Sequence, residues 1–360
     1  MNNPSTCPHF SLCSGCTHAT LDPPIWQEAL TLFAPLKPTL HTLGFSQTRY
    51  KAKLAIRPGP QIGLFKRNTH DVIPIPHCLV HHPAINRAAH LLQQAMTLHN
   101  LSAYSEATAT GTLRYAQFFV DRATSLVQLT LIINDTHNLQ PLLDTLSTHD
   151  LWHSIWLNHQ PKSTNTILGS TFQLIQGEPF LWQTLNSTPV PFHPGAFSQT
   201  HLPLFELMLR QIESWTPPNT RILELYAGVG AIGLTLASKA KEITLVENNP
   251  FAHLSYNQAA KPNITYYPTD AKEAPLTTYD LIIVDPPRKG LDPELLPRLS
   301  APQLIYISCS FESFKRDYHQ LLAHGWRLKD AAGYLLFPGT NHVETLALFE
   351  KCVSGIVIVI

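Results

Sequence analysis

From about residue 220 onward, short apolar runs of strand length alternate with segments whose apolar positions recur at helical spacing. The pattern predicts strands at 221–226, 242–247, 263–267, 280–284 and 303–307, and helices at 231–239, 250–260, 292–298 and 311–323. Such alternation is typical of an α/β fold with a doubly wound, mostly parallel, Rossmann-like sheet. Two further strands near 326–337 and 343–350 have no helix between them, so they predict an antiparallel hairpin at the sheet's edge.

The first half of the chain has a different, mixed α+β pattern. A helix is predicted over 26–43, strands at 49–57 and 63–67, a helix over 83–100, strands at 111–122 and 126–133, a helix over 139–146 and a strand at 154–158. We therefore expect three regions, namely 1–85, 86–194 and a catalytic domain over 195–360.

Composition and charge argue against several classes of protein. The 360 residues are 44% hydrophobic and carry 25 basic and 25 acidic side chains, which argues against a polycationic nucleic-acid binder but leaves room for a local basic patch. No apolar run reaches the length of a membrane span, and the amino terminus does not resemble a secretory signal. We expect a cytoplasmic protein that does not contact a membrane.

Four of the six cysteines form a candidate metal centre. Cys7, Cys13 and Cys16 have the spacing C-x5-C-x2-C, and Cys78 is the fourth. Four thiolates suit either tetrahedral zinc or an iron–sulfur cluster. Because only one C-x2-C pair is present, we favour a 4Fe–4S cluster. Cys352 has no assigned role.

A basic hairpin is predicted between Cys16 and Cys78. Its basic residues are Arg49, Lys51, Lys53, Arg57, Lys66 and Arg67. Either this is a solvated charged face or, as we favour in a chain of zero net charge, it binds phosphates of a nucleic acid.

A glycine-rich turn at 224–233 follows a predicted strand and opens a helix. By itself G-x-G-x-x-G fits a dinucleotide as well as other ligands. Glu224, Glu247, Asp270 and Asp285 stand at or just beyond successive strand ends. Glu224 would repel a pyrophosphate, Glu247 is placed to accept from both ribose hydroxyls, and Asp270 could bind an adenine amine. They fit S-adenosylmethionine, with its cationic sulfonium, ribose and adenine.

Cys309 closes the apolar run 304–308, downstream of Asp285-Pro286-Pro287. An arbitrary cysteine there would be a structural residue. Beside a predicted cofactor site, it is a candidate nucleophile.

Together these motifs resemble the RNA uracil-5 methyltransferases, which make 5-methyluridine in ribosomal or transfer RNA. The resemblance also covers Phe197-Ser198-Gln199, the segment 285–291, Ser308-Cys309 and His342-Val343-Glu344. It implies that Cys309 adds to carbon 6 of a uracil taken out of its stack and that Glu344 removes the proton from carbon 5. It also implies cofactor contacts, which are Gln199, Tyr226, Glu247, Asp285 and, at the adenine, Asp270.

Two departures from the family pattern bear on the target. Iron–sulfur members often begin with a β-barrel RNA-binding domain, which we expect to be missing because the cysteine motif starts at Cys7. The residue two after the nucleophile is Phe311 rather than proline. We expect a monomer acting on 23S ribosomal RNA, with uridine 54 of transfer RNA as the alternative. Other readings are methylation of cytosine carbon 5 or of a protein amide, and a catalytically silent iron–sulfur protein that binds RNA.

Overall fold

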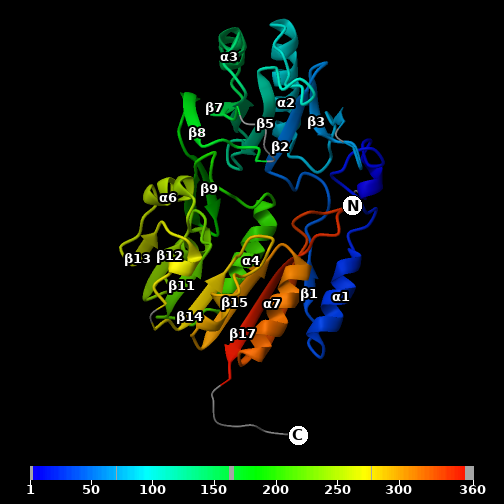
Figure 1. Cartoon of the computed structure of the whole chain (residues 1–360). Helices are drawn as coiled ribbons and strands as arrows, with labels where there is room; N and C mark the ends of the chain where they lie inside the picture. The colour runs from blue at the N-terminus through cyan, green and yellow to red at the C-terminus, as the bar shows by residue number, and fades with distance from the viewer. Residues whose placement is uncertain (1–2, 70, 162–165, 277, 353–360) are drawn as a thin grey trace.

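The computed structural model describes residues 3–69, 71–161, 166–276 and 278–352. Two lobes, each built on one large sheet, lie one above the other in Figure 1. The amino-terminal segment lies beside the junction of the lobes, and the described chain ends at the far end of the lower lobe.

The lower sheet has eight strands in the order β1-β16-β17-β15-β14-β11-β12-β13. Their bounds are β1 Thr39–His41, β11 Arg221–Leu225, β12 Glu242–Val246, β13 Ile264–Tyr267, β14 Leu281–Val284, β15 Gln303–Ser308, β16 Trp326–Tyr334 and β17 Glu344–Lys351. Strands β11 to β15 are mutually parallel, and β17 runs antiparallel to both of its neighbours. The predicted Rossmann-like α/β sheet is confirmed.

The predicted edge position of the last two strands is wrong. β17 lies inside the sheet between β15 and β16, and β1 pairs in parallel with β16 to form the edge. Sequence periodicity could not show this, because the pairing joins residues about 290 positions apart.

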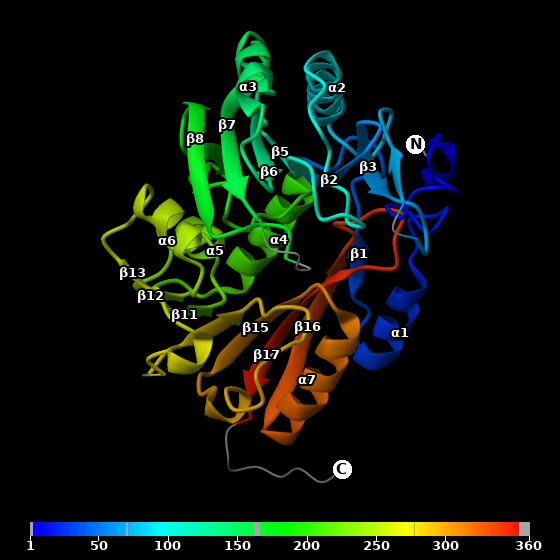
Figure 2. The same cartoon turned by 45° about the horizontal axis from the view of Figure 1, so that its top comes forward.

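Helices cover both faces of the lower sheet. They are α1 Pro24–Phe33, α4 Leu202–Trp215, α5 Ala231–Leu236, α6 Pro250–Asn257 and α7 Phe311–Ala323. α1 and α7 pack together on one face, where the rings of Phe33 and Phe314 are 5.7 Å apart, and Figure 2 shows the two helices side by side. Side chains of α4 and α5 contribute to the core on the opposite face.

Two predicted helices are shorter than expected, and proline explains both. α1 ends at Phe33 rather than 43, because Pro35 and Pro38 cannot continue a helix. The predicted helix at 292–298 is only the 3-10 turn η3 Leu296–Arg298, with Pro297 inside it. The other 3-10 turns are η1 Pro4–Thr6 and η2 Ala271–Glu273.

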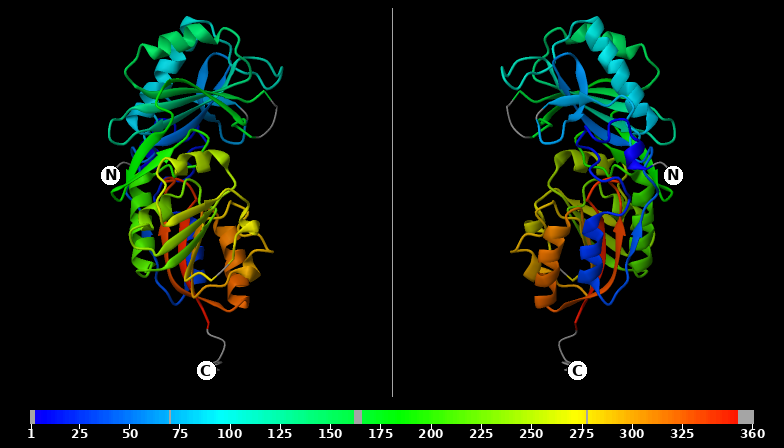
Figure 3. Two further views of the ribbon diagram at one scale, coloured as in Figure 1. Left: turned by 90° about the vertical axis from the view of Figure 1, so that its left-hand side faces the viewer. Right: turned by 90° about the vertical axis from the view of Figure 1, so that its right-hand side faces the viewer.

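The upper sheet has seven strands in the order β4-β3-β2-β5-β6-β7-β8. Their bounds are β2 Lys51–Arg57, β3 Gln61–Phe65, β4 Val72–Pro74, β5 Leu113–Val120, β6 Val127–Ile133, β7 Trp152–His159 and β8 Thr171–Gly177. Helices α2 Pro83–Leu98 and α3 Leu139–Ser147 cover the face that points away from the lower lobe (Figure 3). The sheet runs across the predicted boundary at residue 85, because β2 pairs with β5, while α1 and β1 belong to the lower lobe.

Polar side chains of the upper sheet hold the segment that leads into the lower lobe. After the hairpin β9 Leu181–Leu185 and β10 Thr188–Phe192, the backbone carbonyl of Pro194 accepts from Gln117 Nε2 at 2.9 Å. The carbonyl of Ala196 accepts from Lys51 Nζ, also at 2.9 Å. The upper sheet therefore fixes the chain just before Gln199.

The basic hairpin folds as predicted from β2 and β3, but three of its six basic side chains donate to backbone carbonyls inside the protein. Lys51 and Arg57 are buried, and Arg57 donates to the carbonyls of Ile56 and Arg114. Arg67 donates to the carbonyls of Phe10 and Cys13, in the cysteine loop. Only Lys53 and Lys66 of the six are exposed. The expected phosphate contact therefore stays a prediction, with Lys53 and Lys66 as the exposed candidates.

Among the described residues, no helix is long and apolar enough to cross a membrane.

Candidate active site

A cavity of about 520 Å³ opens at the carboxyl ends of the parallel strands of the lower sheet. All but one of the residues predicted for the cofactor and the chemistry line it, namely Gln199, Tyr226, Glu247, Asp270, Asp285, Cys309 and Glu344, while Glu224 lines a neighbouring cavity. Ligands of open α/β sheets bind in this crevice, because the loops that follow the strands meet there. The sequence-based residue set is thus brought together in one place.

The glycine-rich turn after β11 shapes one wall. Tyr226, Gly228 and Gly230 all have positive φ, at 61°, 54° and 76°, so the backbone turns sharply before α5. Glu247, just after β12, accepts hydrogen bonds from the backbone N–H groups of Gly228 (3.1 Å) and Asn249 (2.8 Å). These contacts fix the carboxylate of Glu247 beside the turn.

Two buried carboxyl groups at the pocket would be stabilised in their ionised form by a bound positive charge. Burial, and next the charge of Glu247, raises the pKa of Asp285 to about 7. Burial chiefly raises the pKa of Glu224 to about 8, and its Oε2 has no hydrogen-bond partner. Glu224 lines a smaller cavity of about 50 Å³ that shares Gln199 and Asp285 with the main one. A bound cation would restore the ionised carboxylates.

Cys309 and Glu344 meet through strand pairing. Ser308, the last residue of β15, pairs with Thr345 of β17, so Cys309 and Glu344 occupy the next position of the same register. Cys309 is half-buried and Glu344 is 3% exposed, with its Oε1 unpaired. Burial raises the pKa of Glu344 well above its ordinary value, and the charge of Asp285 adds to this. Burial, Glu344 and Asp285 also raise the pKa of the Cys309 thiol.

Arg288 supplies the opposing positive charge. It lines the cavity beside Lys289 and His342, and its guanidinium lowers the pKa of both the Cys309 thiol and the Glu344 carboxyl. Arg288 belongs to the segment 285–291, which carries the family resemblance. The pocket also includes Phe337, together with Phe197 and His342 from two other segments of that resemblance.

The four amino-terminal cysteines are gathered in the core beneath the upper sheet. Cys7, Cys13, Cys16 and Cys78 are all buried in one cluster. Burial, followed by the nearby thiols Cys13, Cys78 and Cys7, raises the pKa of Cys16 to about 12. Within the described ranges, no group of three or more His, Cys, Asp or Glu side chains is arranged so that it could hold a metal ion.

The cysteine loop also touches the active-site wall. The carbonyl of Gly339 accepts from the backbone N–H groups of Thr17 (2.7 Å) and His18 (2.9 Å). Arg49, whose charge favours the thiolates of Cys16 and Cys78, lies 5.3 Å from the ring centroid of Phe337. The wall formed by 337–342 is thus built against the cysteine loop.

Comparison with known proteins places this geometry in a family. Residues 269–352 match the model of the tRNA (Uracil-5-)-methyltransferase family, and residues 188–294 match that of the methyltransferase small domain. An uncharacterized RNA methyltransferase of Protochlamydia amoebophila is 40% identical over 373 residues, which cover 96% of this chain and 97% of that relative. The chain belongs to the S-adenosylmethionine-dependent RNA uracil-5 methyltransferase family.

Other relatives agree with this assignment. An uncharacterized RNA methyltransferase of Enterococcus faecalis is 30% identical, over 88% of this chain and 75% of its own length. The structure of the Pyrococcus abyssi tRNA (uracil-54, C5)-methyltransferase in complex with S-adenosyl-L-homocysteine superposes with a TM-score of 0.78. It covers 89% of this chain and 81% of its own at 24% identity, which shows a shared fold.

As a member of this family, the chain is an RNA methyltransferase enzyme that uses S-adenosylmethionine. The expected alternative of a catalytically silent RNA-binding protein is therefore not retained. The acidic crevice suits the cofactor, because S-adenosylmethionine carries a sulfonium and an ammonium group. These cations would stabilise the ionised carboxylates of Glu224 and Asp285.

Proposed function

We propose that this enzyme methylates carbon 5 of a uridine in RNA through a covalent bond between Cys309 and carbon 6 of the base. The observation that carries the proposal is the pairing of a half-buried thiol with an unpaired buried carboxyl group, Glu344, at the rim of an acidic cofactor crevice. A nucleophile and a base that line one pocket are what carbon alkylation of a uracil requires.

The chain's residues would act in sequence. The Cys309 thiolate adds to carbon 6, which forms an S–C bond and makes carbon 5 a nucleophilic enolate carbon. S-adenosylmethionine, when bound, supplies the methyl group that carbon 5 accepts and leaves as S-adenosylhomocysteine. Glu344 then takes the proton from carbon 5, and the C6–S bond breaks to restore the double bond and free the thiolate.

The environment suits both roles. Cys309 lies just before α7, whose amino-terminal end favours a thiolate, and Arg288 favours it further. A carboxyl group with a raised pKa is a stronger base once ionised, which suits Glu344 for removing a carbon-bound proton. Gln199, Tyr226, Glu247, Asp270 and Asp285 would hold the cofactor.

We also propose that Cys7, Cys13, Cys16 and Cys78 hold a 4Fe–4S cluster. A single zinc ion requires all four sulfurs at about 2.3 Å from one point. In a cluster each thiolate binds a different iron, so the sulfurs converge less closely. All four thiols are buried, and burial raises the pKa values of Cys16 and Cys78, so their thiolates would be stabilised by positive charge, which iron supplies. Arg67 closes the loop around them through the carbonyls of Phe10 and Cys13.

The expected target is 23S ribosomal RNA, as the iron–sulfur type implies. Transfer RNA is the second candidate, because the Pyrococcus abyssi protein of similar fold is described as acting on uracil 54 of transfer RNA.

The deciding experiment is a mass-spectrometric nucleoside analysis. Ribosomal and transfer RNA from a strain that lacks the gene are incubated separately with the purified enzyme and S-adenosylmethionine, then digested. We expect 5-methyluridine in one RNA and none with the Cys309→Ala variant. Formation of 5-methylcytidine, or methylation of neither RNA, would overturn the proposal.

A further inference from the structure

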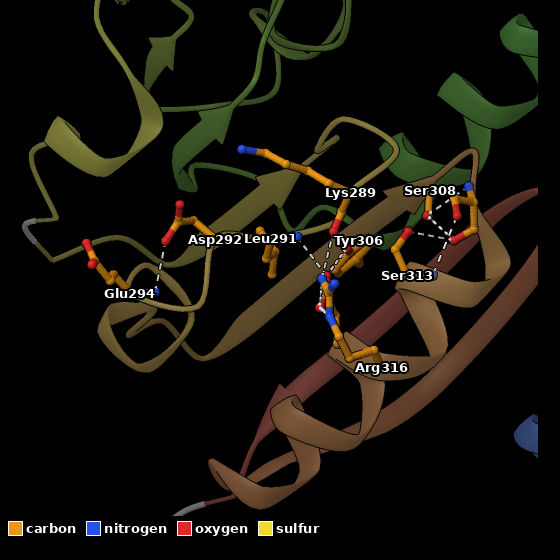
Figure 4. Close-up of polar contacts among 10 residues, drawn as sticks. Lys289, Leu291, Asp292, Glu294, Tyr306, Ser308, Ser313 and Arg316 are labelled. Carbon is orange, nitrogen blue, oxygen red and sulfur yellow. Dashed lines mark hydrogen bonds and ion pairs between the residues drawn. The ribbon is translucent and has the colours of Figure 1, made fainter.

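One buried carboxylate, that of Asp317 on α7, joins two segments that line the active-site pocket. Its side chain is 1% exposed. Asp317 Oδ2 accepts from the backbone N–H of Leu291 at 2.7 Å and from the hydroxyl of Tyr306 at 2.6 Å. Its Oδ1 accepts two bonds from the guanidinium of Arg316, at 2.9 and 2.6 Å. Figure 4 shows these contacts converging between the strand β15, the helix α7 and the loop that carries Lys289 and Leu291.

The first joined segment is the loop at 285–291, which carries Arg288. Arg288 and its two neighbours Pro287 and Lys289 are exposed, so surrounding side chains do not hold them. The loop is held instead at Lys289, whose carbonyl accepts from Arg316 at 2.8 Å, and at Leu291. Gly290, between them, has φ +81°, and a Cβ there would lie 2.4 Å from Arg316 Nη2 and 2.5 Å from Asp317 Oδ2. The glycine lets the loop approach the carboxylate this closely.

The second joined segment is the strand that ends at Cys309. Tyr306 lies three residues before Cys309 in β15 and is fully buried. Beyond the strand, the backbone N–H of Ser310 donates to Ser308 Oγ at 3.2 Å, and Ser313 Oγ donates to the carbonyl of Ser310 at 3.0 Å. The bonds on either side of Cys309 therefore fix its backbone relative to the Tyr306 hydroxyl, from which Asp317 accepts.

The contacts of Asp317 bear on the position of the Arg288 guanidinium relative to the Cys309 thiol. Arg288 is the cation that favours ionisation of Cys309, against burial, Glu344 and Asp285. On its near side the loop continues from β14, whose Val284 pairs with Tyr306 of β15. On its far side it is held at Lys289 and Leu291, and these contacts pass through Asp317 and its neighbour Arg316. The position of Arg288 relative to Cys309 therefore depends in part on Asp317.

We propose that Asp317 is a positioning residue, which fixes the 285–291 loop to β15 and so keeps Arg288 beside Cys309. It touches neither cofactor nor substrate, since it does not line the pocket. The importance of the thiol rests on the function proposed above, but the positioning itself is a property of the free enzyme and can be measured without RNA.

The test follows the alkylation of Cys309 by iodoacetamide across a pH series, with the modified peptide quantified by mass spectrometry. Asp317→Ala should shift the alkylation profile to higher pH and slow alkylation at neutral pH by roughly threefold to tenfold, equivalent to about half to one pKa unit. Asp317→Asn retains an oxygen for Leu291 and Tyr306 and should stay close to wild type. Lys315→Ala is the matched control on the same helix, since Lys315 pairs with Glu28 and Glu312 and lies over the ring of Phe311.

Tyr306→Phe provides an independent variant that removes only the bond between Asp317 and the strand. It should shift the alkylation profile in the same direction as Asp317→Ala, by a smaller amount. If Asp317→Ala fails to bind S-adenosylmethionine, the profile of Tyr306→Phe alone tests whether Asp317 positions Arg288. A wild-type profile in Tyr306→Phe and in folded Asp317→Ala would overturn the proposal. So would a shift to lower pH, because that is the effect of removing a negative charge without moving Arg288. If Cys309→Ala still methylates RNA, the proposed function is wrong, but the alkylation profiles still test whether Asp317 positions Arg288.

Discussion

Cys309 and Glu344 are neighbours in register across the antiparallel strands β15 and β17, one position beyond the pair Ser308–Thr345. Thirty-five positions of sequence separate the two residues, yet the ladder fixes them on one pocket wall. The nucleophile and the base therefore come from rigid strands, rather than from mobile loops.

Replacing the thiol should stop the chemistry without disturbing the cofactor site. We expect Cys309→Ala to lower turnover by a factor of at least about 10³, because no other group can activate carbon 6. Binding of S-adenosylmethionine, measured by calorimetry, should be unchanged, since the acids that surround it remain. Undiminished methylation by this variant would show that Cys309 is not the nucleophile.

Replacing the base should trap the reaction after methyl transfer. In Glu344→Gln we expect a turnover loss of about 10² to 10⁴ and a covalent enzyme–RNA adduct, because the carbon 5 proton can no longer be removed. The adduct is measured as a retarded band in a denaturing gel. Cys309→Ala, combined with Glu344→Gln, is the control that should show no band. If no band forms during turnover, another group is the base.

Methylation should accelerate as the pH rises through the neutral range. The pKa values of Cys309 and Glu344 are both raised, and each must lose a proton before it can react. Initial rates at saturating cofactor should therefore increase by about tenfold per pH unit between the two pKa values, and more steeply below the lower one. Glu344→Gln should retain a single rising limb in adduct formation. A flat rate from acid to alkaline pH would contradict the raised pKa of Cys309.

Glu224 should make the free protein less stable as the pH rises. Its pKa is about 8 in the fold, so between pH 4.5 and about 8 the folded chain retains a proton that the unfolded chain has lost. Stability therefore falls across that window and levels off above it. Relative to wild type, Glu224→Gln should gain stability in denaturant unfolding from pH 5 to pH 8 and gain nothing more above that. An equal difference at all pH values would show that Glu224 is ionised in the fold.

The cysteine loop should carry iron. Protein purified without air should be brown and contain about four irons per chain. Cys78→Ser should lose most of the iron, whereas Cys352→Ser, at an exposed cysteine with no proposed ligand role, should retain it. Stoichiometric zinc in place of iron would overturn the cluster assignment.

Much of the lower lobe was predictable because its signals are local. Each strand from β11 to β15 is a short, mostly apolar run, and the acids after the ends of β12, β13 and β14 reach the crevice by the geometry of parallel strands. Motifs such as Asp285-Pro286-Pro287 and His342-Val343-Glu344 needed no tertiary information to stand out. The lengths of α1 and η3 could have been predicted better by giving more weight to Pro35 and Pro297.

Other features depended on contacts between distant segments. Lys51 and Arg57 look like surface charges in an alternating strand. In the fold both side chains are buried and donate hydrogen bonds to backbone carbonyls. The insertion of β17 between β15 and β16, and the edge strand β1, follow from pairings that no local pattern encodes.

The sequence by itself determined the fold class, the cofactor crevice and the identity of the candidate nucleophile and base, because periodicity and short motifs are properties of neighbouring residues. Only the tertiary structure decided which charges are buried, how Glu344 meets Cys309, and that the carboxylate of Asp317 joins the Arg288 loop to the strand of the thiol. Burial and hydrogen bonding are properties of pairs brought together by folding, and their energies depend on the solvent that folding removes.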